Sequence, residues 1–354
     1  MDGMWLLFAF VISFLVTFAT TPFVKAFAQK IGAVDMPGEA RRIHNRAIPR
    51  LGGLAIFYGF IISVLSLCEI DQGVRGMILG SLIIVIIGIF DDVRSLNAKL
   101  KLLGQILAAG VVVIHGVQID RLTMPEFIAP EGFVELGYFA IPFTIIWIVG
   151  VTNAVNLIDG LDGLAVGVSS IASMSLFCIA LIVSELNIAL ITAALAGACF
   201  GFLPYNFNPA KIFMGDTGAM FLGFILATVS IMGLFKGYAV ISFVVPFLVL
   251  GLPLFDTGFA IIRRIVNKKP IMGADRGHLH HKLIDMGFSQ KKSVGILYMI
   301  STVLGLTAVV LIGSGEIRAL VLVAAIIIGM IFAARIMSSP RPAENSDEGS
   351  SDDD

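Results

Sequence analysis

Charged residues are scarce in this sequence. Asp, Glu, Lys and Arg make up only 14% of it, whereas 57% of the residues are hydrophobic. A water-soluble protein of this length needs far more polar surface to cover its core, so a soluble globular fold is excluded. The hydrophobic residues also come in long blocks, without the alternation of a strand or the stripe of an amphipathic helix. Such blocks are typical of helices immersed in lipid.

The sequence also lacks an excess of basic residues, and cysteine is rare in it. The formal net charge is −1, so no overall field would attract nucleic acid, and we expect no nucleic-acid partner. The three cysteines lie in apolar runs and lack the spacing of metal ligands. We therefore expect neither a disulfide framework nor a zinc site, and interpret each cysteine as a small apolar residue.

The apolar blocks predict an all-α polytopic membrane protein with about eleven transmembrane helices. The first block has no basic leader and no small-residue cleavage site, so we expect it to be retained as a helix. We expect one integral-membrane domain over 1–339 and a disordered acidic cytoplasmic tail over 340–354. The predicted helices span 4–28, 51–69, 75–91, 100–117, 139–156, 163–184, 188–204, 217–235, 239–262, 293–313 and 318–337.

The basic residues predict the orientation. With eleven spans, nearly all Lys and Arg fall in one set of loops, which the positive-inside rule assigns to the cytoplasm. The N-terminus is then outside and the C-terminus is cytoplasmic. All polar motifs fall on the same cytoplasmic side, as a reaction between a cytosolic solute and a lipid headgroup would require.

The first motif is Phe90-Asp91-Asp92, at the cytoplasmic end of the third predicted helix. Two adjacent carboxylates that emerge from an apolar run are costly unless a cation or a proton compensates them. The partial negative charge at the C-terminal end of a helix also favours a bound cation. The alternative is a pair of solvated acids in a loop.

The second motif lies between the fifth and sixth predicted helices. Asn156, Asp159 and Asp162 recur every three residues there, with glycines that permit a tight turn. Oxygen ligands of this kind suit Mg²⁺, which prefers one or two carboxylates together with phosphate and water. The alternative is an Asx-rich turn that caps the next helix.

The third motif leads into the eighth predicted helix. It contains Asn206, Phe213 and the turn Gly215-Asp216-Thr217-Gly218. An aromatic residue and such a turn at a helix N-terminus suit a nucleotide diphosphate with a metal ion. The alternative is that Asp216 merely caps the helix.

Two basic segments complete the set. Arg276 stands beside three histidines, His278, His280 and His281, which we expect to donate hydrogen bonds to phosphate or sugar oxygens. A zinc site or a solvated basic loop is the alternative. The segment 41–53 offers His44 and Arg46 to a phosphate, although by itself it reads as a positive-inside stop before a helix.

Taken in order, these motifs resemble those of the polyprenyl-phosphate N-acetylhexosamine-1-phosphate transferases. The resemblance covers residues 5–337 and rests on Pro-Arg-Leu-Gly-Gly, Phe-Asp-Asp, Asn-Leu-Ile-Asp-Gly-Leu-Asp-Gly, Phe-Met-Gly-Asp-Thr-Gly and Asp-Arg-Gly-His-Leu-His-His. The histidine motif resembles the bacterial branch that uses UDP-N-acetylglucosamine. The sister branch, which uses UDP-N-acetylmuramoyl-pentapeptide, carries Lys-x-x-Thr-Pro-Thr-Met-Gly-Gly where this chain ends its segment in Pro49-Arg50-Leu-Gly52-Gly53.

The resemblance implies a reaction and a location. A polyprenyl phosphate, undecaprenyl phosphate in bacteria, attacks the β-phosphorus of UDP-N-acetylglucosamine; UMP leaves and a lipid-linked diphosphate sugar forms. Mg²⁺ is the implied cofactor, with Mn²⁺ as a substitute. The enzyme would lie in the bacterial plasma membrane with its site on the cytoplasmic face. It would begin a surface glycan such as teichoic acid or O-antigen.

The resemblance also implies roles for residues. Asp216 is the first-choice metal ligand, with Asp92 and either Asp159 or Asp162 near it, and Asp91 takes the proton of the lipid phosphate or positions its headgroup. The implied substrate contacts are Phe213 under the uracil, polar contacts from Asn156 and Asn206, a phosphate contact from Lys99, phosphate contacts from His44 and Arg46, and sugar-phosphate contacts from Arg276, His278, His280 and His281.

Several alternatives stay open. The donor could be another UDP-N-acetylhexosamine or UDP-N-acetylmuramoyl-pentapeptide, and the reaction could pass through an aspartyl-phosphate. A membrane transporter is the rival class, but it needs acids at mid-helix, and Asp256 is nearly alone in such a place. Long apolar faces also leave room for a homodimer.

Overall fold

The computed structural model describes residues 2–35, 47–123, 131–234, 244–268, 270 and 277–312. Three of the expected site residues, His44, Arg46 and Arg276, lie outside the described residues. The expected last helix, 318–337, and the expected acidic tail lie outside them as well.

Within these residues the chain is almost entirely helical. Two short antiparallel strand pairs accompany the helices: β1 (Val34–Asp35) with β2 (Ile48–Pro49), and β3 (Arg121–Thr123) with β4 (Phe133–Glu135). The helices are α1 (Asp2–Ile31), α2 (Gly53–Leu67), α3 (Gln72–Arg94), α4 (Ala98–Ile114), the 3₁₀ turn η1 (Gly137–Phe139), α5 (Ala140–Leu157), α6 (Leu164–Ile182), α7 (Leu186–Asn206), α8 (Gly215–Leu234), α9 (Val244–Val249), α10 (Gly251–Val266), α11 (Leu279–Asp285) and α12 (Gln290–Ile312).

The expectation of a polytopic helical membrane protein is confirmed. Among the described residues, seven helical segments are long and apolar enough to cross a bilayer, and α2 is a shorter apolar helix. The number eleven and the orientation of the termini stay predictions. The seven segments are Gly3–Lys30, Gln72–Arg94, Gly137–Leu157, Leu164–Ile182, Leu186–Asn206, Gly215–Gly233 and Gln290–Ile312.

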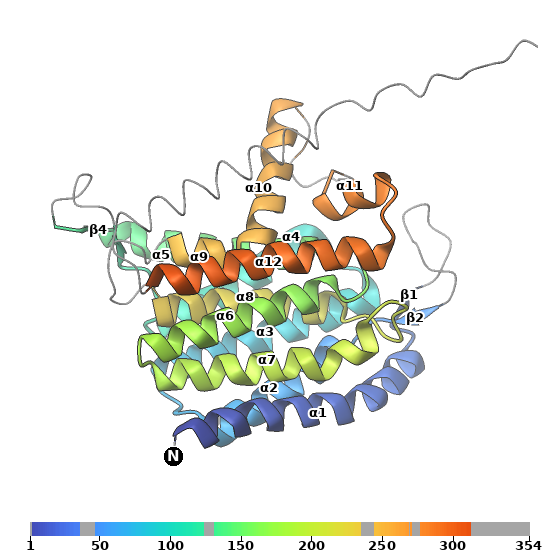
Figure 1. The fold of residues 1–354 in the computed structure, drawn as a ribbon, viewed down its shortest axis with the longest axis horizontal. Coiled ribbons are helices and arrows are strands. Elements are labelled where there is room, and N and C mark those ends of the chain that lie inside the picture. Colours follow the sequence, from blue (N-terminus) through green and yellow to red (C-terminus); the bar gives the residue numbers. More distant parts are fainter. Residues whose placement is uncertain are drawn as a thin grey trace, which may run out of the picture.

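The ninth predicted span, 239–262, is interrupted. Its described part forms two helices, α9 and α10, that meet at Leu250. Pro253 explains the interruption, because proline has no N–H to donate to the carbonyl four residues earlier but is tolerated in the first turn of a new helix. In Figure 1, α10 runs across the direction of the bundle and projects beyond it. The block is therefore not one continuous span.

Small residues allow the helices of the bundle to pack closely. A Cβ on Gly197 of α7 would lie 2.2 Å from the carbonyl oxygen of Phe10, and one on Gly201 would lie 2.5 Å from that of Phe14. Glycine at these positions lets α7 approach the α1 backbone closely, as in many membrane-helix contacts. α2 is joined to α1 by the hydroxyl of Ser63, which donates to the carbonyl of Ala9 at 2.8 Å.

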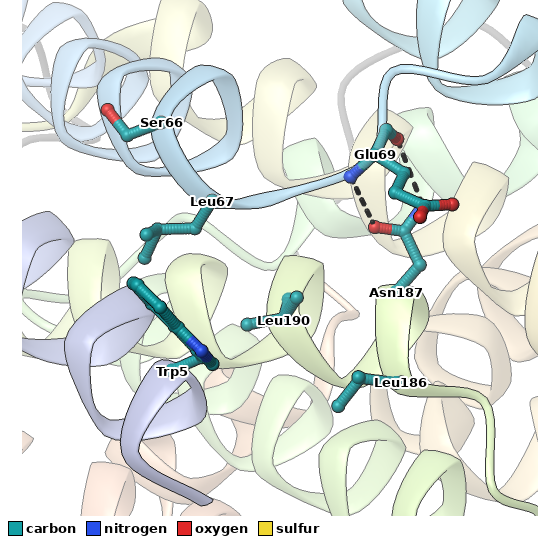
Figure 2. Close-up of a pocket in the computed structure, with 7 residues that line it drawn as sticks. All are labelled: Trp5, Ser66, Leu67, Glu69, Leu186, Asn187 and Leu190. Carbon is teal, nitrogen blue, oxygen red and sulfur yellow. Dashed lines mark hydrogen bonds between the residues drawn. The ribbon is translucent and has the colours of Figure 1, made fainter. Parts of the chain in front are cut away.

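The two ends of the bundle differ. Figure 1 shows β1, β2 and α11 at one end and the N-terminus and β4 at the other. At the N-terminal end, a pocket of about 420 Å³ opens beside Trp5, Leu67 and Leu190 (Figure 2). There Asn187 exchanges two hydrogen bonds of 3.0 Å with the backbone of Glu69, which ties the α2–α3 turn to the start of α7. The polar motifs lie at the opposite end.

Candidate active site

The segment before α2 runs beside the segment before α8. Phe213 donates its N–H to Pro49 at 2.8 Å, and the N–H of Gly52 donates to the carbonyl of Phe213 at 2.9 Å. Gly53 must be glycine, because a Cβ there would lie 2.1 Å from the backbone nitrogen of Gly218. This pairing brings Arg50 to the N-terminus of α8.

Asp92, at the end of α3, caps that N-terminus. Its Oδ1 accepts the N–H of Asp216 at 2.9 Å, and its Oδ2 accepts the N–H and the hydroxyl of Thr217 at 3.0 and 2.6 Å. Arg50 adds an ion pair at 3.2 Å. The turn needs glycine at 215, where φ is +69° and a Cβ would lie 2.4 Å from the Asp92 carboxylate. Asp92 therefore positions α8, and both of its oxygens are used in doing so.

Lys101 joins the two remaining carboxylates of this region. Its Nζ donates to Asp91 Oδ2 at 3.0 Å and also pairs with Asp216 Oδ2. The other oxygen of Asp91 accepts the N–H of Leu96 at 2.6 Å. A single ammonium thus holds the end of α3 against the start of α8 and partly offsets the like charge of the two acids.

Sequence reasoning chose Lys99 for the phosphate contact, but the structure brings Lys101 into the carboxylate cluster. The side chain of Lys99 is exposed in the first turn of α4. The signal that could have found Lys101 is helical spacing: it precedes Gln105, Ala108 and Val112 on the buried face of α4.

The second motif is held by hydrogen bonds to the loop before α8. Asp162 Oδ2 accepts from the amide of Asn208 at 2.9 Å and from the N–H of Ala210 at 3.0 Å. Asn206 is buried; its amide oxygen accepts from Gly163 at 3.1 Å, and its amide nitrogen donates to Ile212 at 3.0 Å. Asp162 and Asn206 therefore shape the turn by binding backbone and a neighbouring amide.

Asp159 has a different environment. Desolvation by the surrounding protein raises the pKa of Asp159 to about 8, and the negative charges of Asp216, Asp92 and Asp162 act in the same direction. Among the described residues, the Asp159 carboxylate forms no hydrogen bond or ion pair. Asp159 therefore lies in the negative field of Asp216, Asp92 and Asp162 and has no paired cation among the described residues.

The three histidines occupy different environments. His278 Nδ1 lies 2.9 Å from Asp256 Oδ2, and its ring stacks on that of His280 with centroids 5.7 Å apart. His280 is buried, and a Cβ on Gly160 would lie 2.4 Å from its Nε2. Burial lowers the pKa of His280 to about 4, with the charge of His281 acting in the same direction, so His280 is neutral at physiological pH.

The remaining expected residues lie around this cluster. Asn156 is half-buried at the end of α5, and Phe213 is half-buried and anchored through its backbone. Sequence reasoning did not select several residues that the structure adds to the site. These are Arg50, Lys101, Thr217, Asn208 and also Gln290, whose Oε1 accepts from Asn208 at 2.8 Å.

The donors present suit a hard dication. Asp216 and Asp159 offer carboxylate oxygens, and a divalent cation would offset both the desolvation of Asp159 and the negative charge of its neighbours, which together raise its pKa. Within the described ranges, no three His, Cys, Asp or Glu side chains converge enough to hold an ion by themselves. Mg²⁺ commonly takes only one or two protein carboxylates and completes its shell with phosphate and water, so the residues fit this ion.

A cluster of carboxylates and cations at one end of an apolar helical bundle is the arrangement expected of a membrane-embedded phosphotransfer enzyme. The family model "Glycosyl transferase family 4" matches residues 74–234, the stretch from α3 to α8 that carries Asp91, Asp159 and Asp216. Together with the relatives described next, this match shows that the chain belongs to that family of transferases, as its motifs predicted.

The similar proteins are bacterial. The chain is 45% identical over 304 residues to the probable undecaprenyl-phosphate N-acetylglucosaminyl 1-phosphate transferase of Bacillus subtilis, covering 86% of this chain and 84% of the relative. It is 36% identical over 311 residues to the decaprenyl-phosphate N-acetylglucosaminephosphotransferase of Mycobacterium tuberculosis, covering 80% and 76%. A phospho-N-acetylmuramoyl-pentapeptide-transferase of Desulforudis audaxviator is 34% identical over 240 residues, covering 60% and 71%.

Proposed function

We propose that this enzyme transfers N-acetylglucosamine-1-phosphate from UDP-N-acetylglucosamine to undecaprenyl phosphate, with release of UMP. The observation that carries the proposal is the cluster in which Lys101 joins Asp91 to Asp216 beside the Asp159 turn. Similarity supports the donor, because the Bacillus relative is matched at higher identity and over more of this chain than the pentapeptide-transferase.

The acceptor end of the reaction belongs to Asp91 and Lys101. The lipid phosphate is already mostly ionised near neutral pH, since its second pKa is near 6. Its nucleophilic oxygen therefore needs orientation more than deprotonation, and the Lys101 ammonium supplies a positive charge for it. Asp91, which Lys101 holds in place, accepts the remaining proton or fixes the headgroup.

The donor end belongs to Asp216, Asp159 and the histidines. Asp216 and Asp159 are the residues that would hold Mg²⁺, and the bound ion would neutralise the diphosphate. Asp92 keeps α8 and therefore Asp216 in register. His278, His280 and His281 would contact the diphosphate and sugar, and Phe213 would stack on the uracil.

The site would face the cytoplasm, where UDP-sugars are made. The predicted orientation supports this face, since the polar end of the bundle carries the loops that hold most Lys and Arg residues. A polyprenyl phosphate would reach the same end from the inner leaflet, because its chain is soluble only in the bilayer.

The test is UMP release by purified protein with UDP-N-acetylglucosamine, undecaprenyl phosphate and Mg²⁺, with and without EDTA. Asp216→Asn should reduce release at least about 100-fold, as expected for loss of an electrostatic group at the reacting centre. The matched control is Glu135→Gln, which removes one carboxylate from the exposed β4 strand at the opposite end.

Each result has a definite meaning. Release that needs lipid and metal and that fails only in Asp216→Asn would establish the reaction, the donor and the ion together. Release from UDP-N-acetylmuramoyl-pentapeptide but not from UDP-N-acetylglucosamine would reassign the donor. If a folded protein released no UMP from any UDP-N-acetylhexosamine, the transferase proposal would fail.

A further inference from the structure

α10 holds the start of the histidine segment at two points. Asp256 accepts hydrogen bonds from His278 and Leu279, and Arg263 Nη1 donates to the carbonyl of Gly277 at 2.9 Å. Asp256 and Arg263 are seven residues apart, so they lie on one face of α10, two turns from each other. The helix that departs from the bundle direction is therefore the support of this segment.

The two carboxylate oxygens of Asp256 contact different partners. Oδ1 accepts the N–H of Leu279 at 2.8 Å, and Oδ2 lies 2.9 Å from His278 Nδ1. Both side chains are nearly buried, at 7% exposed for Asp256 and 8% for His278. An ionised carboxylate only accepts hydrogen bonds, so Nδ1 of His278 must carry the proton it donates. Nε2 is then the nitrogen left for another partner.

The other side of the segment contacts the Asp159 turn. The His280 ring packs against Gly160, where a Cβ would lie 2.4 Å from its Nε2. Residues 277–280 are thus held between α10 and the turn that contains Asp159 and Asp162. A change in the attachment to α10 would be transmitted to the site through His278 and His280.

We propose that Asp256 is a positioning residue that acts through His278. By accepting from Nδ1 it fixes the ring orientation and the proton at that nitrogen, and so it sets the direction and the hydrogen-bonding role of Nε2 toward the UDP-sugar. This assignment rests on the proposed function and adds a residue to it. Asp256 touches neither the sugar nor the reacting atoms; its effect on them passes through the ring.

A simple helix cap would behave differently. In Asp256→Asn the amide oxygen still accepts from Leu279, so the support of α11 is kept. The amide nitrogen, however, is a donor, and facing His278 Nδ1 it forces the neutral tautomer with its proton on Nε2. The substitution therefore moves the ring proton from Nδ1 to Nε2 and reverses the hydrogen-bonding role of Nε2 while preserving the fold.

The experiment measures KM for UDP-N-acetylglucosamine and kcat in wild type, Asp256→Asn, His278→Gln and the double variant. We expect each single variant to raise KM about tenfold, as for the loss of one hydrogen bond to the UDP-sugar, with a smaller change in kcat. The double variant should be no worse than His278→Gln, because Asp256 acts only through that ring. Thr257→Val is the matched control, since its buried hydroxyl has no partner in the described structure and the change keeps its shape.

Two results would overturn the inference. Multiplicative effects in the double variant would mean that Asp256 acts independently of His278. An unchanged KM in His278→Gln would do so without any reliance on the folding of an Asp256 variant. Absence of turnover in the wild type would instead overturn the proposed function, and this inference with it.

Discussion

Two groups of carboxylates meet at the polar end of the bundle, and they are neutralised differently. Asp91, Asp92 and Asp216 are bound by Lys101, Arg50 and the N-terminus of α8. Asp159, in the neighbouring turn, has no such partner among the described residues, and its pKa is raised to about 8. The first group is held in position by cations and N–H groups of the protein, whereas Asp159 has no cation of the protein beside it.

The two groups therefore differ in role: the first holds helices in position, and Asp159 is available to bind a cation or a proton. A carboxylate that accepts three hydrogen bonds and an ion pair, as Asp92 does, is fixed in place and has both oxygens occupied. A desolvated carboxylate in a negative field gains most from a cation or a proton. The first group therefore fixes the helices that form the site, and Asp159 is the carboxylate that favours binding of a cation.

The largest expected effect comes from removing the cation of the bound group. Lys101→Met leaves Asp91 and Asp216 facing each other without their shared ammonium, and we expect UMP release to fall more than about 100-fold. Lys99→Met removes a lysine from the same helix and should change release less than about twofold. Equal losses in the two variants would show that α4 contributes charge generally and would contradict a specific role for Lys101.

The next largest effect is expected at Asp92, which holds the end of α3 against α8. Asp92→Asn breaks the buried pair with Arg50 and one of the contacts to α8, and we expect the free energy of unfolding to fall by about 3 kcal/mol. Thermal unfolding in detergent measures this change. Asp71→Asn is the control, because Asp71 caps α3 with one hydrogen bond at the other end and should cost about 1 kcal/mol or less. A smaller loss for Asp92→Asn than for Asp71→Asn would contradict the framing role.

Asp159 should make the stability of the folded protein depend on pH. Unfolded Asp159 ionises near pH 4, but the folded protein keeps its proton until about pH 8. Between these values the folded state binds more protons, so without divalent cations its stability falls as pH rises from about 4 to about 8. Asp159→Asn should flatten that decline in unfolding measurements with EDTA. Mg²⁺ should flatten it too; a decline identical in all three would rule out this carboxylate as its origin.

The smallest expected effect concerns the connection between the Asp162 turn and α12. Asn208→Ala removes two hydrogen bonds, one to Asp162 and one to Gln290, while the N–H of Ala210 still binds Asp162. We expect a loss of about 1 to 2 kcal/mol in unfolding free energy and a modest rise in KM for the donor. Gln290→Ala removes one of the two bonds and should cost less than Asn208→Ala.

Much of this site could be predicted from the sequence because its residues stand in local motifs. The acids at 91, 92, 159, 162 and 216 and the histidines at 278, 280 and 281 were selected from their motifs, and the family of the chain was identified correctly. What a motif does not give is the partner of each acid. Asp92 is bound by backbone 124 residues later in the chain, so its capping role depends on packing that no local pattern encodes.

The fold likewise has features that the sequence predicts and features that it does not. Hydropathy found the long apolar helices, since each needs only enough apolar residues in a row. It read 239–262 as one span because Gly251 and Pro253 do not lower the average hydropathy enough to show a break. Lys99 was expected from the resemblance alone, and Lys101 was not considered. Both lie in the first turn of α4, and only the helical period of its buried residues separates them.

The cap that Asp92 provides has a consequence for biosynthesis. Ribosomes add about 5 to 20 residues per second, so the α8 backbone that binds Asp92 is made roughly 6 to 25 seconds after Asp92 itself. During that interval the carboxylate at the end of α3 has to remain hydrated at the membrane surface. The cap can therefore form only after α8 has been made, and it joins two helices that are synthesised at different times.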